Sequence, residues 1–520
     1  MNISKRKINF YFFSFLKHDF RASITVFFVA LPLCLGISLA SGAPVYSGLI
    51  AGIIGGTVVS IISKSQLSVS GPAAGLTAIA AAAIVQLGSL ELFFLAVSLA
   101  GLLQVLLGFL RLGGFTHFIP SSVIKGMLAA IGIILISKQV PLFFGYDQPD
   151  FWTKELFNVF TFSHAYSHID NIYRHTSAGI TLVSLISLAV LISWRKIFPQ
   201  KLEFIPASFI AVMSGVLMIF LFQNALHIFE FKPTQFISLP ENVFGGIKSP
   251  ALNALSLNYD LLKTAFVIAM VASLETLLSV EAIDKLDPYN RSTPMNRELV
   301  AQGVGNIFSG MLSGLPITAV IVRSSANAEA GARTRTSSFA HGVWLVLALL
   351  LCIPAINMIP YCVLAVILIR TGYNLAKPKM ILKIYRQGRE QFLPFVVTVV
   401  AILLTDLLIG VLLGIVYSIY FMVKHTYRAG YTLLVSEEGH ISHYNIQLAL
   451  NVSFLNKKRI IEMLERIPPY SSVVIDGSKS VYIDHDILEI FQDYKSKARL
   501  RHIELIMKSV REVETIELHG

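Results

Sequence analysis

The stretch Ser68-Val-Ser-Gly-Pro-Ala-Ala-Gly75 interrupts a strongly apolar region, and a similar stretch, Gly314-Leu-Pro-Ile-Thr-Ala319, interrupts the second half of the chain. Glycine and proline mark both as extended backbone that leads into a short helix. In a membrane, such backbone is tolerated only where it is buried in protein or lines a cavity. Matching interruptions in the two halves of a hydrophobic chain therefore predict the binding site of a transporter.

Each interruption is expected to place the N-terminus of a short helix inside the membrane. Two half-helices that point their N-termini at one another create a positive potential with free N–H donors, which suits a small anion. The alternative is a pair of ordinary kinked helices that pack through small residues.

The composition is that of a membrane protein. The chain has 520 residues, of which 54% are hydrophobic and only 14% charged, against about a quarter charged in ordinary soluble domains. This excludes a soluble enzyme and a disordered chain. The net charge of +11 comes from basic residues in short loops between apolar segments, where they orient a membrane protein. We therefore expect the lipid bilayer, and no nucleic acid, as a partner.

About fourteen apolar segments lie between residues 21 and 425, which we assign to a transmembrane transport domain. A span needs about 20 apolar residues, so the segments near 72–87, 317–330 and 360–372 are short or broken. The predicted segments are 22–40, 45–63, 72–87, 89–110, 118–138, 176–194, 205–223, 258–280, 296–313, 317–330, 338–354, 360–372, 391–407 and 408–424.

The loop charges predict the orientation. Lysine and arginine gather in the even-numbered connections, as in Arg195, Lys196, Arg333 and Arg335, which places both termini in the cytoplasm. Residues 1–20 are basic and aromatic without a small-residue cleavage site, so we expect a cytoplasmic N-terminal segment and not a removed signal peptide. A bacterial inner membrane is the expected location.

Residues 430–515 have the composition of a small soluble α/β unit. Val473-Val-Ile475 predicts a buried strand that ends at a turn. Asp484-His-Asp486 predicts the cap of a helix that continues through Ala498, and residues 502–507 predict another strand.

Two ionisable residues lie deep in apolar segments, Glu275 and Arg323. Such residues are costly in a membrane and are functional candidates by default. Arg323 is expected to attract or balance a transported anion, and Glu275 to take up a coupling proton. The alternatives are that Arg323 snorkels from a helix end and that Glu275 is its fixed structural partner.

The sequence offers no sign of covalent catalysis or of a metal centre. It contains no HExxH, Walker, GxSxG or CxxC motif, and its three cysteines have no metal-ligand spacing. Gly48, Gly52 and Gly56 form a small-residue stripe that predicts close helix packing. We expect neither an enzyme nor a resident cofactor.

The chain resembles the SulP family of anion transporters, also called sulfate permeases, over nearly its whole length. Residues 430–515 are similar to the family's C-terminal STAS domain through Val474-Ile-Asp476 and Ile483-Asp484. The segments that carry the resemblance in the apolar region are Ala30-Leu-Pro-Leu-Cys-Leu-Gly-Ile37, Ser41-Gly42, Val69-Ser-Gly-Pro72, Ser273-Leu-Glu-Thr-Leu-Leu-Ser279, Gly314-Leu-Pro316, Arg323-Ser-Ser-Ala-Asn327 and Gly331-Ala-Arg-Thr334.

The resemblance implies an α-helical polytopic membrane protein with about fourteen spans as two inverted seven-span repeats. It implies a core domain, made of spans one to four and eight to eleven, that moves against a gate domain in an elevator-type motion. It also implies a homodimer.

The resemblance places a small inorganic anion between the starts of the third and tenth spans. Glu275 and Ser279 match the positions that couple transport to an ion, either H⁺ or Na⁺. The residues that match the anion site, or border it, are Ala73, Ala74, Thr318, Ala319, Val320, Ile321, Arg323, Leu33 and Cys34.

Three positions depart from the family pattern. Many members have glutamine where this chain has Leu33, which it shares with bacterial bicarbonate-transporter-like members. Sodium-coupled bicarbonate carriers have aspartate and threonine where this chain has Glu275 and Ser279, which favours H⁺ without excluding Na⁺. Asp484-His-Asp486 lacks the phosphorylatable serine of regulatory STAS proteins, so we expect this domain to dimerise or dock.

The resulting hypothesis is a secondary active transporter of bicarbonate or sulfate, coupled to H⁺ or Na⁺. Three alternatives stay open. The first is a nucleobase or dicarboxylate symporter of the same fold, the second a non-transporting membrane regulator that acts through the STAS-like domain, and the third a channel.

Overall fold

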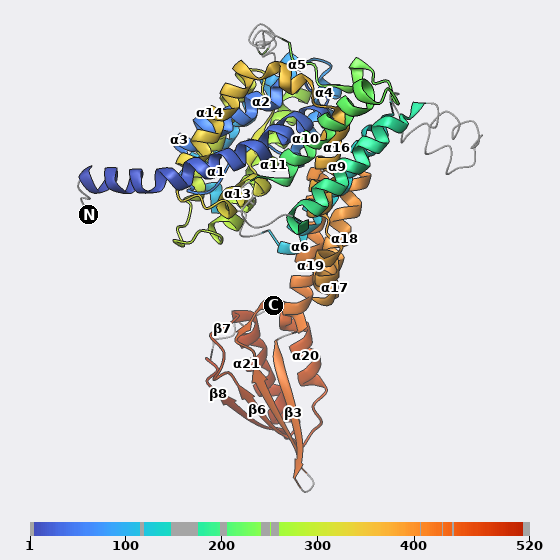
Figure 1. Ribbon diagram of the computed structural model, residues 1–520. Coiled ribbons are helices and arrows are strands. Elements are labelled where there is room, and N and C mark those ends of the chain that lie inside the picture. Colours follow the sequence, from blue (N-terminus) through green and yellow to red (C-terminus); the bar gives the residue numbers. More distant parts are fainter. Residues whose placement is uncertain are drawn as a thin grey trace. The chain divides into compact units, whose positions relative to one another are not determined.

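The computed structural model describes residues 5–114, 119–146, 175–197, 205–240, 250, 259–405, 407–428, 430–438 and 441–512. The chain divides into two compact units. One comprises residues 1–388 and 395–412, and the other comprises residues 389–394 and 413–520. The first unit is almost entirely helical, whereas the second contains a four-stranded sheet (Figure 1).

The helices of the first unit follow the apolar segments of the sequence, and every predicted segment contains a helix. Six of the described helices are long and apolar enough to cross a bilayer, so the number of spans stays a prediction. The helices are α1 (Lys5–Ala40), α2 (Val45–Ile54), α3 (Ser60–Ile62), α4 (Thr77–Leu87), α5 (Leu90–Phe109), α6 (Ser121–Phe143), α9 (Ala178–Ile197), α10 (Ala207–Phe220), α11 (Tyr259–Asp284), α12 (Met295–Met311), α13 (Ile321–Glu329), α14 (Thr336–Leu351), α15 (Ile353–Asn357), α16 (Tyr361–Leu375) and α17 (Pro378–Arg386), with α18 (Arg389–Leu404) and α19 (Leu407–Arg428) divided between the two units.

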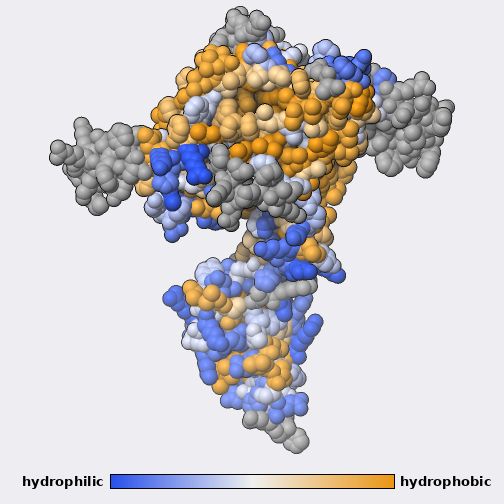
Figure 2. Space-filling model, in the orientation of Figure 1, coloured by the Kyte–Doolittle hydropathy of each residue, from blue (hydrophilic) through white to orange (hydrophobic). Residues whose placement is uncertain are grey.

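Most helix contacts of the first unit fall into two groups, and α1 also contacts α10 and α16 of the second group. In one group α1 packs against α2, α13 and α14, and α5 packs against α11 and α12; in the other, α16 packs against α6 and α9, and α9 against α10. Figure 1 shows α2, α3 and α14 on one side of this unit and α9 and α16 on the other. Figure 2 shows apolar residues over most of its visible face, as a lipid-facing surface requires.

Glycines allow the helix backbones to touch within each group. A Cβ atom placed on Gly303 of α12 would lie 2.6 Å from the carbonyl oxygen of Gly101 on α5. In the other group, a Cβ atom on Gly132 of α6 would lie 2.5 Å from the carbonyl oxygen of Gly372 on α16. Only glycine allows the two backbones to come this close. Close packing of this kind holds helices together in lipid, where no hydrophobic driving force acts between them.

The predicted glycine stripe also packs as expected. Gly48 faces the backbone carbonyl of Cys34 on α1, and a Cβ atom on Gly56 would lie 2.6 Å from the Cα atom of Gly342 on α14. The prediction of close helix packing for this stripe is therefore confirmed.

The two interruptions pair with each other. Strands β1 (Ser70–Pro72) and β2 (Ile317–Ala319) form a two-stranded antiparallel sheet in which Gly71 lies opposite Thr318. A short 3-10 turn, Ala74–Leu76, follows β1 and leads into α4, while α13 follows β2. The backbone that cannot hydrogen-bond within a helix is thus partly satisfied by its counterpart from the other half of the chain.

Buried side chains from neighbouring helices satisfy the remaining groups of this small sheet. Asn306 of α12 accepts from the Ile317 nitrogen at 2.6 Å and donates to the Ile317 oxygen at 3.0 Å. The hydroxyl of Thr276 on α11 accepts from the Ala319 nitrogen at 3.2 Å, and the hydroxyl of Ser324 on α13 accepts from the Val69 nitrogen at 2.9 Å. These polar side chains fix where each half-helix begins.

The second unit is a small α/β domain. Its sheet has the order β3 (Tyr431–Glu438), β4 (Ile441–Leu448), β6 (Ser472–Asp476) and β8 (Glu504–Lys508), with β3 antiparallel to β4 and the other pairs parallel. Helices α20 (Lys457–Glu465) and α21 (His485–Leu500) contribute to its core, and β5 (Asn451–Val452) pairs with β7 (Tyr482–Ile483).

The secondary-structure predictions for this unit are confirmed. The predicted strand at residues 473–475 is β6, and the strand predicted at residues 502–507 is β8. Asp484 caps α21, because its carboxylate accepts from the Asp486 nitrogen at 3.1 Å.

Candidate functional site

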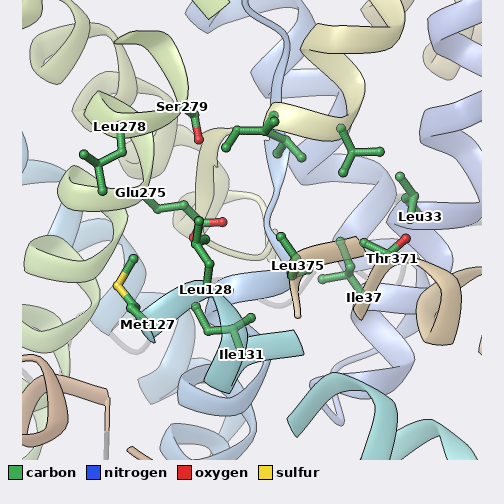
Figure 3. Close-up of a pocket in the computed structure, with 15 residues that line it drawn as sticks. Leu33, Ile37, Met127, Leu128, Ile131, Glu275, Leu278, Ser279, Thr371 and Leu375 are labelled. Atoms are coloured by element: carbon green, nitrogen blue, oxygen red, sulfur yellow. The ribbon is translucent and has the colours of Figure 1, made fainter. Parts of the chain in front are cut away.

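A cavity of about 50 Å³ lies where the two half-helices begin. Elements of both helix groups enclose it, namely α1, α11 and the half-helices from one group and α6 and α16 from the other. Figure 3 shows their side chains converging on one space. The lining residues are Leu33, Ile37, Ala74, Gly75, Met127, Leu128, Ile131, Glu275, Leu278, Ser279, Val320, Ile321, Val322, Thr371 and Leu375.

Neither residue that precedes a half-helix caps it with its side chain. These residues, Ala73 and Val320, have extended backbones and apolar side chains that accept no hydrogen bond. Ala74 and Gly75 of the first half-helix and Ile321 and Val322 of the second line the cavity, and the backbone N–H of Gly75 interacts with the Glu275 carboxylate. Uncapped N-termini carry partial positive charge, so the cavity is suited to an anion.

Glu275 is the acidic group of this cavity. Its carboxylate points into the pocket beside Leu128 (Figure 3), and its Oε2 atom is buried without a hydrogen-bond partner among the described residues. Ser279 lies one turn further along α11 and lines the same cavity. The two residues expected to couple transport to an ion therefore share one space with the half-helix N-termini.

Arg323 is fully buried, with 0% of its surface exposed, and it does not line the cavity. Its Nη2 atom donates to the Pro72 carbonyl at 3.3 Å, while its Nε and Nη1 atoms have no hydrogen-bond partner in the described part of the chain. Because the guanidinium is buried, the snorkelling alternative is wrong. Within the described residues it forms no ion pair with Glu275, so the fixed-partner alternative finds no support.

The other predicted residues divide between the cavity and its surroundings. Leu33, Ala74, Val320 and Ile321 line the cavity. Thr318 and Ala319 lie in β2, and Ala73 precedes the first half-helix, so these three residues shape the site without lining it. Cys34 lies with Arg323 beside Gly52, where a Cβ atom would be 2.6 Å from the thiol sulfur and 3.9 Å from Nη1.

The part of the cavity wall that α6 and α16 provide was not predicted from the sequence. Met127, Leu128 and Ile131 come from α6, and Thr371 and Leu375 from α16. Four of these are ordinary apolar residues of a span, and the Thr371 hydroxyl donates to the Ile367 carbonyl one turn back at 2.9 Å, as threonines in helices commonly do. No local signal in the sequence distinguishes them from residues that face lipid.

A helical membrane protein with two interrupted helices that meet at a buried pocket has the architecture of a transporter. Residues 16–398 match the sequence profile of the Sulfate permease family, and the chain belongs to this family.

Its relatives cover most of its length. The protein YvdB of Bacillus subtilis (strain 168) is 27% identical over 427 residues, which cover 81% of this chain and 76% of YvdB. The bicarbonate transporter BicA of Picosynechococcus sp. is 25% identical over 410 residues, which cover 77% of this chain and 69% of BicA. The family and these relatives are transporters, so the protein is not an enzyme.

Solved structures share the fold. The transmembrane domain of a cyanobacterial bicarbonate transporter, BicA, superposes with a TM-score of 0.62 at 23% identity, covering 78% of this chain and 97% of that one. The overall structure of SLC26A9 gives a TM-score of 0.75 at 17% identity, covering 95% of this chain and 84% of that one. The fold is thus that of a helical membrane transporter with a strand-containing C-terminal domain.

Proposed function

We propose that the protein is a secondary active transporter that carries a small inorganic oxyanion, bicarbonate or sulfate, together with H⁺. The observation that carries the proposal is the shared cavity, in which an unpartnered carboxylate oxygen of Glu275 faces two uncapped half-helix N-termini. The family description names sulfate and the relative BicA is named a bicarbonate transporter, which supplies the two candidate anions.

Coupling follows from the charge of Glu275 in this proposal. An ionised carboxylate beside the half-helix N-termini competes with an anion for the same positive potential, and it repels the anion in a cavity of low dielectric constant. Protonation removes that charge and makes room for the anion. Proton and anion therefore bind together and are released together.

H⁺ fits this cavity better than Na⁺, the other coupling ion considered. Hard cations bind through several oxygen ligands. The polar side chains that line the cavity are those of Glu275, Ser279 and Thr371, and the hydroxyl of Thr371 already donates to its own helix. A proton requires only the carboxylate.

The finer architecture belongs to the same proposal. The cavity lies between the two helix groups, so an elevator motion of the group that contains α1, α11 and the half-helices would carry the anion past α6 and α16. The proposal includes about fourteen spans in two inverted repeats, a transport domain at residues 21–425, a STAS-like domain at 430–515, cytoplasmic termini in a bacterial inner membrane, and a homodimer.

The size of the cavity argues against a nucleobase symporter. An engineered cavity of about 150 Å³ binds benzene, whereas this cavity measures about 50 Å³. A nucleobase is larger than benzene and does not fit the present conformation, so the size of the cavity favours a smaller ligand.

The decisive experiment compares Glu275→Gln with the unchanged protein in proteoliposomes. Uptake of labelled bicarbonate and sulfate is measured under imposed pH and Na⁺ gradients. The unchanged protein should respond to the pH gradient, whereas Glu275→Gln should not. The matched control is Glu281→Gln on the same helix, whose side chain is 39% exposed and pairs with Lys285 at 3.1 Å. If Glu275→Gln still follows the pH gradient, the coupling role is wrong, and flux that ignores every cation gradient indicates a channel.

A further inference from the structure

We propose that the cavity selects its anion by charge, and that it takes a monovalent oxyanion in preference to divalent sulfate. This inference rests on the proposed function, because it concerns the anion that the proton-coupled site accepts. The charge and the hydrogen-bonding groups of the residues that line the cavity support it.

The charge of the lining side chains is the first property that bears on selectivity. Of the residues that the structure describes, none that lines the cavity is lysine, arginine or histidine. The nearby Arg323 does not line the cavity, and its Nη2 atom donates to the Pro72 carbonyl at 3.3 Å. A doubly charged anion thus finds no side chain that pairs with it.

The second property is the small number of hydrogen-bond donors. Most lining residues are apolar, and the polar side chains are those of Glu275, Ser279 and Thr371. The Thr371 hydroxyl is engaged with the Ile367 carbonyl, and the Gly75 N–H interacts with the Glu275 carboxylate. The remaining donors are the Ser279 hydroxyl, the other first-turn N–H groups and a protonated Glu275. These donors can hydrogen-bond the three oxygens of a planar monovalent anion more completely than the four oxygens of sulfate.

The third property is the charge balance. Each half-helix N-terminus carries about half a positive charge, so two of them together balance about one negative charge. The desolvation cost of an ion grows with the square of its charge, so sulfate requires about four times the compensation of a monovalent anion of similar size. Arg323 adds positive potential only from behind β1, outside the cavity wall, so no lining side chain supplies that compensation by direct contact.

The test uses the full-length protein in proteoliposomes with an inward pH gradient. Labelled bicarbonate uptake is measured in the presence of nitrate or of sulfate as competitors. Nitrate is the preferred monovalent probe because it stays ionised and does not leak through the bilayer as a neutral acid. Nitrate is expected to inhibit uptake at concentrations at which sulfate leaves it unchanged. Equal or stronger inhibition by sulfate, or faster transport of labelled sulfate, would overturn the proposal.

Two variants probe the same selectivity from the protein side. Leu33→Gln and Leu128→Gln each place an amide donor in the cavity wall, and each should raise the ratio of sulfate to nitrate transport by about tenfold, which corresponds to about 1.4 kcal/mol. Leu286→Gln, at a loop residue that is 51% exposed, is the control. Melting curves in detergent select the variants that fold, and an unchanged ratio in a folded cavity variant would overturn the proposal.

The two proposals fail in different ways. If no anion follows the pH gradient in the unchanged protein, the proposed function itself is wrong. If sulfate is preferred while the response to the pH gradient persists, only the charge selectivity is wrong.

Discussion

The carboxylate of Glu275 lies directly against the backbone of Gly75. A Cβ atom placed on Gly75 would lie 2.6 Å from Oε2 and 2.9 Å from Oε1 of Glu275. The acid on α11 and the first turn of the first half-helix therefore share one space, and a side chain at position 75 would displace the carboxylate. A change in the charge of Glu275 therefore acts directly on the first-turn N–H groups that are proposed to bind the anion.

Gly75→Ala is expected to displace the carboxylate and reduce proton-coupled uptake by about tenfold, while the melting temperature in detergent changes little because the Glu275 side chain can turn away. Uptake under a pH gradient is the measurement. The control is Gly114→Ala, since a Cβ atom at Gly114 meets nothing within 4 Å. Undiminished coupled uptake in Gly75→Ala would show that the contact has no functional role.

The positions of the interruptions could be predicted from the sequence, whereas their pairing could not. Glycine and proline destabilise the interior of a helix, as at Gly71, Pro72 and Pro316. Because these residues lie in apolar surroundings, they indicate non-helical backbone that is buried. The pairing of β1 with β2 joins residues far apart in the chain, and strands of three residues carry too little pattern to specify a partner. The two strands are held in place by side chains such as Asn306, which bonds the backbone of Ile317. Nothing in the sequence around Asn306 indicates this contact.

The site was predictable to a similar degree. Glu275 was identifiable because a carboxylate in an apolar span is costly, and the resemblance placed Ala74 and Val320 near it. The direction of the Arg323 side chain was not predictable, because it depends on the space left by Gly52 and Gly71. The wall from α6 and α16 carries no local signal, since apolar residues that face a cavity and those that face lipid have the same composition.

Asn306 is expected to be essential for the position of the second half-helix. It is fully buried, bonds both backbone groups of Ile317, and donates to Gln104 at 2.7 Å. Asn306→Ala leaves the Ile317 N–H and C=O groups unsatisfied, at a cost of about 2–4 kcal/mol. The melting temperature in detergent should fall clearly. The control is Gln86→Ala, which removes an exposed hydrogen bond to Asp260 and should leave the melting temperature unchanged. Equal melting temperatures for the two variants would contradict the prediction.

Arg323 provides a test that separates its charge from its packing. Arg323→Met removes a buried cation with two unpartnered nitrogen atoms, so stability should be maintained or rise, as replacements of buried charges by apolar residues often show. Anion binding should weaken by about tenfold, because the positive potential behind β1 is lost. Arg323→Lys keeps the charge and should bind the anion more tightly than Arg323→Met. Binding is measured through the shift in melting temperature with added nitrate, and equal shifts in both variants would exclude an electrostatic role.

The loop that follows α11 contains a pH-sensitive ion pair outside the membrane-spanning segments. Arg291 contacts both carboxylate oxygens of Asp287, with Nε at 2.6 Å and Nη2 at 3.0 Å, and its guanidinium lies over the ring of Tyr289 at 4.8 Å. Burial acts to raise the pKa of Asp287, but the hydrogen bonds and charge of Arg291 and the backbone N–H groups outweigh it, so the pKa lies below its ordinary value of 3.8.

A carboxyl whose pKa is lower in the folded state stabilises the fold at every pH above its unfolded value, and that contribution is lost as the pH falls through the folded value. Asp287→Asn should therefore lower the melting temperature equally at pH 7 and pH 5, by an amount equivalent to about 2 kcal/mol, and the difference should shrink below about pH 4. Glu281→Gln, which breaks an exposed pair with Lys285, should have little effect at any pH because exposed pairs contribute little. A difference for Asp287→Asn that grows on acidification would show that the pair does not stabilise the loop in its ionised form.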